Sequence, residues 1–155
     1  MQMTHFMSLL SDNQPWNLII FMGIPMVMIE TIAITELYIL SKREKANPTV
    51  KLINKFGSIF FGLYFTGVFI YLLNTVVIPL TQTGGWLSWI DVAAVGINLS
   101  GVLFLLPLAL LELGLIQKNK SEERKLKMHF MLVSGFLIVG HAAMILGMVD
   151  LSIMS

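Results

Sequence analysis

The chain contains no cysteine, which excludes disulfide bonds and thiolate metal sites. Charged residues are scarce, at 12% of 155 residues, whereas 56% are apolar and the mean hydropathy is +0.82. Residues 1–15 lack the basic segment and cleavage pattern of a secretory signal, so we expect the first hydrophobic run to be a permanent span. No nucleophile–His–acid set, phosphate loop or zinc motif is present, so an enzymatic role is the less favoured interpretation. This composition is typical of an integral membrane protein.

Four apolar segments are long enough to cross the hydrocarbon core, which needs about 20 helical residues. We place them at residues 15–41, 56–80, 91–117 and 127–150. Short polar links join them, and Pro79 with Gly84 and Gly85 marks the break between the second and third segments. The sequence therefore predicts an all-α, four-transmembrane-helix bundle that forms a single membrane domain over residues 1–155.

The basic residues predict how the chain is oriented in the membrane. All ten lie in two of the links, and they are Lys42, Arg43, Lys45, Lys51, Lys55, Lys118, Lys120, Arg124, Lys125 and Lys127. The positive-inside rule places both basic links in the cytoplasm and both termini outside, at the plasma membrane if the source is bacterial. Trp16, Trp86 and Trp89 fall at the opposite end, as expected of an interfacial aromatic belt. Topology thus accounts for the basic charge, and no nucleic-acid partner is expected.

A faint internal repeat relates the two halves of the chain. The first span contains IPMVMIE and the third contains LPLALLE, each a proline followed five residues later by a glutamate. The second and fourth spans each contain two glycines at a spacing of five, namely Gly62, Gly67, Gly135 and Gly140. These matches indicate two parallel repeated helical hairpins related by an axis along the membrane normal, as in some transporters.

Glu30 and Glu112 lie within the first and third apolar spans. A charge inside the bilayer costs several kcal/mol, so each carboxylate marks a candidate functional site. Helical periodicity assigns further polar and sulfur-containing side chains to one face of each span. The candidate cation or metal ligands are Glu30, Glu112, His141, Met22, Met26, Met144 and Met148, and the supporting polar residues are Asn74, Asn98, Tyr71, Glu36 and His129. Since lipid disfavours such faces, we expect them to meet in the bundle interior.

The depth of these residues follows from the helical rise of about 1.5 Å per residue. Met26 and His141 come to similar depths near the middle, and Met22 lies level with Met144 nearer the outside. Glu30 and Glu112 fall in the cytoplasmic half.

Structural roles are the alternative for several of these residues. The methionines can be core filler, and the asparagines can bridge helices. Glu36 and His129 can be interfacial side chains that reach water.

The methionines resemble a motif of a known family. The motif consists of Met22-x3-Met26 and Met144-x3-Met148, with Met1, Met3, His5 and Met7 in the expected outer segment. It resembles the methionine motifs of high-affinity copper transporters, which implies Cu(I) as the ion because thioether sulfur selects it. The resemblance covers only these motifs, because those transporters have three spans.

The segment IETIAIT around Glu30 is similar to the first helix of the small multidrug resistance family. Those four-helix proteins use a glutamate there, which implies proton and cation exchange at Glu30. This chain differs from that family in its length, in Glu112 and in its large basic links.

These observations favour a small polytopic membrane protein that binds or transports a cation, either a metal ion or a proton. One alternative is a haem- or quinone-binding redox subunit with His141 and Met26 as axial ligands. His129 and His141 lie about 18 Å apart on one helix and cannot bind the same iron. Another alternative is a non-catalytic accessory subunit, in which partner helices of a homo-oligomer or a larger complex satisfy the buried polar groups.

Overall fold

The computed structural model describes residues 2–153, and Met1 lies outside them. Its secondary structure is helical, with no β-strand among these residues. Four helices are long and apolar enough to cross a membrane: Trp16–Lys45, Pro48–Thr83, Trp89–Glu112 and Glu122–Gly147. The predicted all-α bundle of four spans is confirmed.

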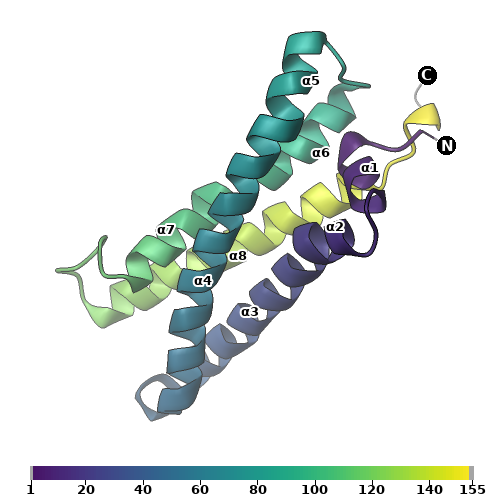
Figure 1. Ribbon diagram of the computed structural model, residues 1–155. Helices are drawn as coiled ribbons and strands as arrows, with labels where there is room; N and C mark the ends of the chain where they lie inside the picture. Colours follow the sequence, from purple (N-terminus) through teal and green to yellow (C-terminus); the bar gives the residue numbers. More distant parts are fainter. Residues whose placement is uncertain (1, 154–155) are drawn as a thin grey trace.

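Each span is built from one or more helical segments (Figure 1). A short helix α1 (His5–Ser11) precedes the first span, which comprises α2 (Trp16–Leu18), the π-helix η1 (Ile19–Gly23), α3 (Ile24–Lys42) and a 3₁₀ turn η2 (Arg43–Lys45). The second comprises α4 (Pro48–Leu72), the π-helix η3 (Leu73–Val77) and α5 (Ile78–Thr83). The third comprises α6 (Trp89–Ser100) and α7 (Val102–Glu112), the fourth is α8 (Glu122–Gly147), and η4 (Leu151–Ile153) follows it.

Capping residues explain why three helix ends differ from the predicted boundaries. The second span begins at Pro48 rather than at residue 56, because the Asn47 side chain caps it by accepting a 2.8 Å hydrogen bond from the Thr49 amide. The fourth begins at Glu122 rather than at residue 127 behind the capping residue Ser121. The third ends at Glu112 rather than at residue 117, since Gly114 adopts a left-handed φ of 72° that stops a helix.

Both π-helices end directly before an Ile-Pro pair, which contains Pro25 in the first span and Pro79 in the second. Proline lacks an N–H and its ring crowds the preceding turn, so the turn before it widens. Pro107, by contrast, lies inside α7 without a π-helix. The first span therefore shares this feature with the second rather than with the third, and the internal repeat stays a prediction.

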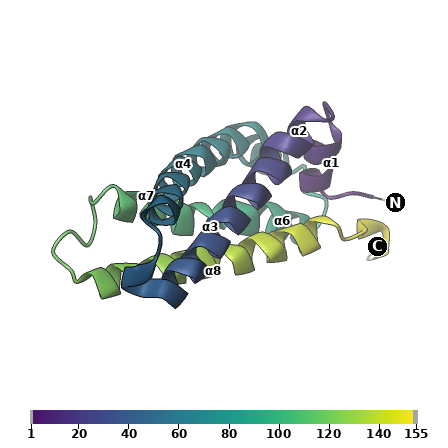
Figure 2. The ribbon, with the colours of Figure 1, turned by 90° about the horizontal axis from the view of Figure 1, so that it is seen from below.

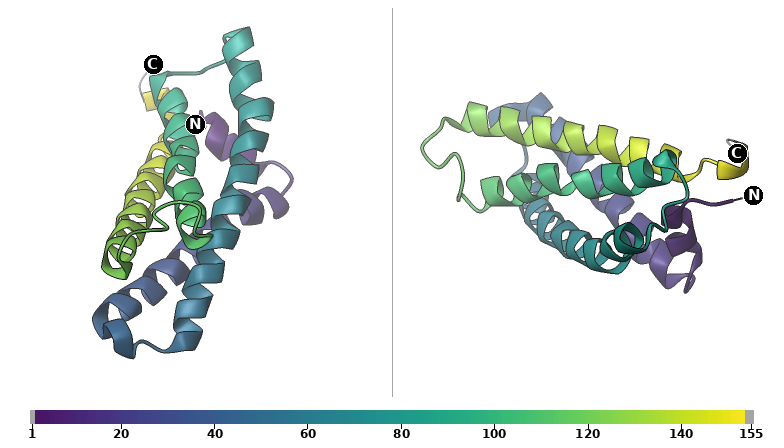
Figure 3. Two further views of the ribbon diagram at one scale, coloured as in Figure 1. Left: turned by 90° about the vertical axis from the view of Figure 1, so that its left-hand side faces the viewer. Right: turned by 90° about the horizontal axis from the view of Figure 1, so that it is seen from above.

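The spans pack so that α4 lies against α7 and α3, and α8 lies against α6 and α7. Both termini and the α5–α6 link lie toward one end of the bundle, and the two basic links lie toward the other (Figure 1 and Figure 3). The two basic links thus share an end, as four antiparallel spans require, and which side of the membrane they face stays a prediction.

Gly62 sets the distance between α4 and α7. A Cβ at this position would collide with the carbonyl oxygen of Leu105 and the side chain of Ala109. Small residues that let backbones approach closely are typical of helix contacts in membranes.

An aromatic layer lies at the centre of the bundle. Phe61, Phe65 and Phe136 pack edge-to-face, with ring centroids 5.3–6.1 Å apart. Ile29, Ile32 and Leu105 join the same buried cluster. These apolar side chains divide the bundle into a half near the basic links, below called the inner half, and a half near the termini, called the outer half.

Helix α1 folds over the outer end, which the sequence analysis did not predict (Figure 2). The Thr4 side chain caps it and donates a 2.7 Å hydrogen bond to the Gly147 carbonyl. Phe6 and Leu10, one turn apart, are buried against α4 and α6. The N-terminal segment is therefore part of the packed structure.

Candidate functional site

Three ionisable side chains meet in the inner half, and we call them the inner cluster: Glu36 of α3, Glu112 of α7 and His129 of α8. His129 is 3% exposed, and its Nδ1 lies 2.8 Å from Oε2 of Glu36. Its Nε2 lies 3.3 Å from Oε1 of Glu112. The imidazole thus stands between two carboxylates, and three spans supply the groups.

Ser58 of α4 adds a fourth helix to the inner cluster. Its hydroxyl donates to the Asn54 carbonyl over 2.8 Å, so its oxygen faces Nε2 of His129, 3.1 Å away, as an acceptor. Asn54 in turn donates 2.9 Å to Thr35 Oγ1 and 3.2 Å to the Ile32 carbonyl, which ties α4 to α3. With the Ser58 hydroxyl donating to Asn54 and the Glu112 carboxylate ionised, Nε2 is the donor on that side of the ring.

Glu36 is the deepest member, at 1% exposure, yet its hydrogen bonding is incomplete. The His129 contact has the distance of an ion pair without hydrogen-bond alignment, and Oε1 has no partner among residues 2–153. Buried carboxylate oxygens are normally satisfied, and such an exception calls for an explanation. The side chain of Glu112, at the end of α7, is 21% exposed. The inner cluster therefore contains one buried carboxylate, Glu36, and one accessible carboxylate, Glu112.

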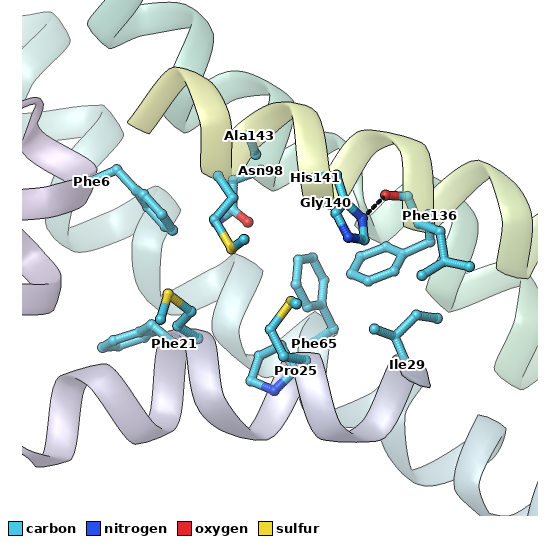
Figure 4. Close-up of a pocket in the computed structure, with 14 residues that line it drawn as sticks. Phe6, Phe21, Pro25, Ile29, Phe65, Asn98, Phe136, Gly140, His141 and Ala143 are labelled. Carbon is cyan, nitrogen blue, oxygen red and sulfur yellow. Dashed lines mark hydrogen bonds between the residues drawn. The ribbon is translucent and has the colours of Figure 1, made fainter. Parts of the chain in front are cut away.

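Several predicted site residues come together in the outer half instead. A cavity of about 40 Å³ between α3 and α8 is lined by Met22, Met26, Asn98, His141 and Met144 (Figure 4). Nδ1 of His141 lies 2.7 Å from the Leu137 carbonyl oxygen. Met26 and His141, and likewise Met22 and Met144, were predicted to lie at similar depths, and all four line this cavity. Their depth in a membrane stays a prediction.

Glu30 lies apart from both groups, so its expected interior position is wrong. It is exposed on the face of α3 that carries Val27 and Ile34, which are 64% and 67% exposed. The packed face of α3 contains Ile29, Ile32 and Glu36. Glu30 follows Ile29 directly and therefore points about 100° away from that face. A role for Glu30 in cation binding stays a prediction.

Four further residues were expected in the interior and are exposed: Tyr71, Asn74, His141 and Met148, although His141 also lines the cavity between α3 and α8. Tyr71 is 50% exposed and stacks on Phe21, with ring centroids 5.6 Å apart. Asn74 bridges no helices, because its side chain donates 2.7 Å to the Ile70 carbonyl of its own helix. Met148 follows the end of α8 and is 55% exposed.

The interfacial interpretation of Glu36 and His129 is also wrong, because both are buried. Sequence reasoning missed Asn54 and Ser58, since they precede or barely enter the predicted second span. Their spacing of four places both on one helical face, which was the available signal.

A second polar group lies at the outer end and was missed as well. Nδ1 of His5 lies 2.5 Å from Oδ2 of fully buried Asp91, whose Oδ1 accepts 2.7 Å from the His5 amide. The Leu87 amide donates to Asp91 over 3.3 Å. This group holds α1 against the start of α6, which makes it a structural clamp.

Residues 2–153 contain no group of three or more His, Asp or Glu side chains with the geometry of a metal site. The inner cluster therefore differs from the predicted metal centre, because its carboxylates lie on opposite sides of the imidazole instead of converging on one point.

Four apolar helices with buried ionisable groups define a small integral membrane protein. The chain belongs to a family of unknown function, DUF6803, whose sequence profile matches residues 1–155. Neither the curated proteins nor the solved structures include a match to it.

Proposed function

We propose that this protein binds and exchanges a cation inside the bilayer, and that the cation at the inner cluster is the proton. The observation that carries this proposal is the imidazole of His129, held between two carboxylates from different helices. Chains of Asp, Glu and His inside a membrane are typical of proton relays.

The geometry favours a proton over a metal ion. An oxygen atom already lies beside each ring nitrogen of His129: Glu36 Oε2 is 2.8 Å from Nδ1, and Ser58 Oγ and Glu112 Oε1 are 3.1 and 3.3 Å from Nε2. The Ser58 contact has hydrogen-bond geometry, and the two carboxylates are close enough to pair with the ring. A metal ion needs a ring nitrogen whose lone pair is free to face it. A proton needs only donors and acceptors in a row, which the inner cluster supplies.

Access to the inner cluster supports exchange on the side of the basic links. Glu112 is the accessible member and ends α7 directly before the link that contains Lys118 and Lys120. Beyond Glu36, the aromatic layer of Phe61, Phe65 and Phe136 separates the inner cluster from the outer half. With the orientation that the positive-inside rule predicts, protons enter the inner cluster from the cytoplasm and reach Glu36 through Glu112 and His129.

Infrared difference spectroscopy of the reconstituted protein tests this proposal. A step from about pH 8 to about pH 5, the interval in which imidazole ordinarily titrates, is expected to produce a carboxyl signal in the wild type. Glu36→Gln and Glu112→Gln are each expected to alter that signal. Glu30→Gln is the matched control, because Glu30 is on the same helix as Glu36 but outside the inner cluster. A signal that is identical in Glu36→Gln, Glu112→Gln and the wild type contradicts the proposal.

A role as a subunit of a larger membrane assembly is the second candidate, and Glu30 favours it. The carboxylate lies on an exposed apolar face within a span, where lipid cannot satisfy it. A polar side chain on a partner helix could pair with this carboxylate. Because the chain has no cysteine, Ile34→Cys provides a single oxidative cross-linking site on this face, and only monomer after oxidation in native membranes would exclude a homodimer through it.

The haem alternative fits the structure poorly. Oxygen atoms lie 2.8–3.3 Å from both ring nitrogens of His129 and occupy the space that iron would need, which leaves His141 as the one remaining imidazole in the described spans. A haem placed inside the outer cavity, whose volume is about 40 Å³, would have to displace Phe65 and Phe136, which line it.

A further inference from the structure

The outer cavity holds a donor set that the inner cluster does not use. Met22 and Met26 are one turn apart on the first span, and His141 and Met144 are one turn apart on α8. In Figure 4 the sulfur atoms, drawn yellow, lie along the space between α3 and α8, and the ring of His141 enters it from α8. The first span therefore contributes two thioethers to the cavity, and α8 contributes one thioether and one imidazole.

The hydrogen bond of His141 fixes which nitrogen is available. The Leu137 carbonyl can only accept, so Nδ1 carries the proton in the 2.7 Å contact. In the neutral imidazole, Nε2 then carries the lone pair. Metal-binding histidines almost always donate their other N–H to a carbonyl or carboxylate in this way, which orients the ring.

Small residues beside His141 and Met144 leave space for an ion in the outer cavity. The residues beside His141 and Met144 on the same face of α8 are Gly140 and Ala143, and both line the cavity. Its volume of about 40 Å³ exceeds the roughly 10–15 Å³ that one water-sized sphere occupies. Met22 belongs to the π-helix η1, a type of widened turn that is frequent at functional sites.

The chemistry of the donors selects the ion. Thioether sulfur is soft and prefers Cu(I), and imidazole also binds copper. No carboxylate lines the cavity, so nothing there offsets the charge of a divalent ion. We propose that the outer cavity binds one Cu(I) ion through Met22, Met26, Met144 and Nε2 of His141. This site is independent of the inner cluster, so its failure leaves the proton proposal standing.

Competition between the purified full-length protein and a colorimetric Cu(I) chelator, under anaerobic reducing conditions, measures this binding. The wild type is expected to bind one Cu(I) per chain. The double variant Met26→Leu/Met144→Leu removes two of the four ligands and is expected to lose more affinity than the roughly 10- to 100-fold that follows when only a hydrogen-bond partner of a ligand is removed. Leucine conserves volume and is tolerated in cores, so the variant should fold.

Three controls define the outcome. Met131→Leu removes a methionine of α8 that is 61% exposed and does not line the cavity, and it should bind like the wild type. Met3→Leu/Met7→Leu tests the N-terminal methionines, and Glu36→Gln tests the inner cluster. Both are also expected to bind like the wild type. Loss of affinity in either of these variants, or wild-type affinity in Met26→Leu/Met144→Leu, overturns the assignment.

X-ray absorption of the Cu(I)-loaded wild type provides a test that needs no variant. The expected first shell contains sulfur together with nitrogen. A shell of nitrogen and oxygen without sulfur contradicts the site.

Discussion

The inner cluster and the outer cavity hold polar side chains in opposite ways. In the inner cluster, Glu36, Glu112 and His129 are paired with one another across helices, at distances of 2.8 and 3.3 Å. In the outer cavity, His141 is bonded to its own helix, and the sulfur atoms surround a space. Paired charges in a low-dielectric interior are costly to separate, whereas methionine adapts to what it contacts. The inner half is therefore suited to moving protons between fixed groups, and the outer half is suited to binding an ion.

The largest effect is expected at the inner cluster, from His129→Leu. The substitution leaves the buried Glu36 and the half-buried Glu112 without their shared partner, and breaking a buried ion pair such as Glu36–His129 costs about 3–5 kcal/mol. Unfolding in detergent micelles measures the loss. Glu122→Gln is the control, because it removes only the exposed 2.8 Å pair with Lys125, and such pairs contribute about 0–1 kcal/mol. Equal stability of the two variants would show that the inner cluster is not a coupled buried group.

A glycine comparison tests the close approach of α4 and α7, the helices that carry Ser58 and Glu112 of the inner half. Gly62→Ala forces the helices apart, which is expected to cost about 1–3 kcal/mol as overpacking. Gly67→Ala on the same helix meets nothing within 4 Å and should be neutral or stabilising. The same unfolding measurement compares them, and a Gly62→Ala variant as stable as Gly67→Ala would contradict the close packing.

Asp91→Ala is expected to act on the outer half alone. It removes the acceptor of the His5 and Leu87 amides, and an unsatisfied buried donor costs about 1–3 kcal/mol. Release of α1 then uncovers the outer cavity, because Phe6 lines it. Limited proteolysis near the N-terminus should accelerate, while the pH-dependent infrared signal of the inner cluster stays unchanged. Exposed Asp12→Asn is the control, and equal cleavage of both variants would exclude the clamp.

The smallest effect is expected from Asp150, which joins the two termini outside the spans. Hydrogen bonds from the Ser152 hydroxyl and amide, and then from the Gln2 amide, hold the pKa of its carboxyl below the ordinary value of 3.8. A lowered folded-state pKa means that this contribution is present above pH 3.8 and is lost as the pH falls through the folded-state pKa. Hydrogen exchange of the Gln2 amide should therefore show an extra acid-dependent step that Asp150→Asn lacks. The same step in both proteins would contradict this.

The sequence predicted the class of fold because apolar runs of spanning length have few other solutions. It named all three members of the inner cluster without grouping them, since periodicity assigns residues to a face of one helix but not the rotation of that helix against its neighbours. Glu30 illustrates this limit, because it lies one position from the buried Ile29. Helix α1 was missed for a different reason: its anchors, Gly147 and Asp91, are distant in sequence.

Nitrogen NMR of the His129 side chain in lipid nanodiscs tests the central claim most directly. Assignment comes from the signals that disappear in His129→Gln. Between about pH 5 and pH 8, the ring signals of the wild type should shift, and the midpoint should move in Glu36→Gln but not in Glu30→Gln. Ring signals that stay constant over this interval, and are the same in Glu36→Gln, would show that the inner cluster is a fixed ion pair that exchanges no proton.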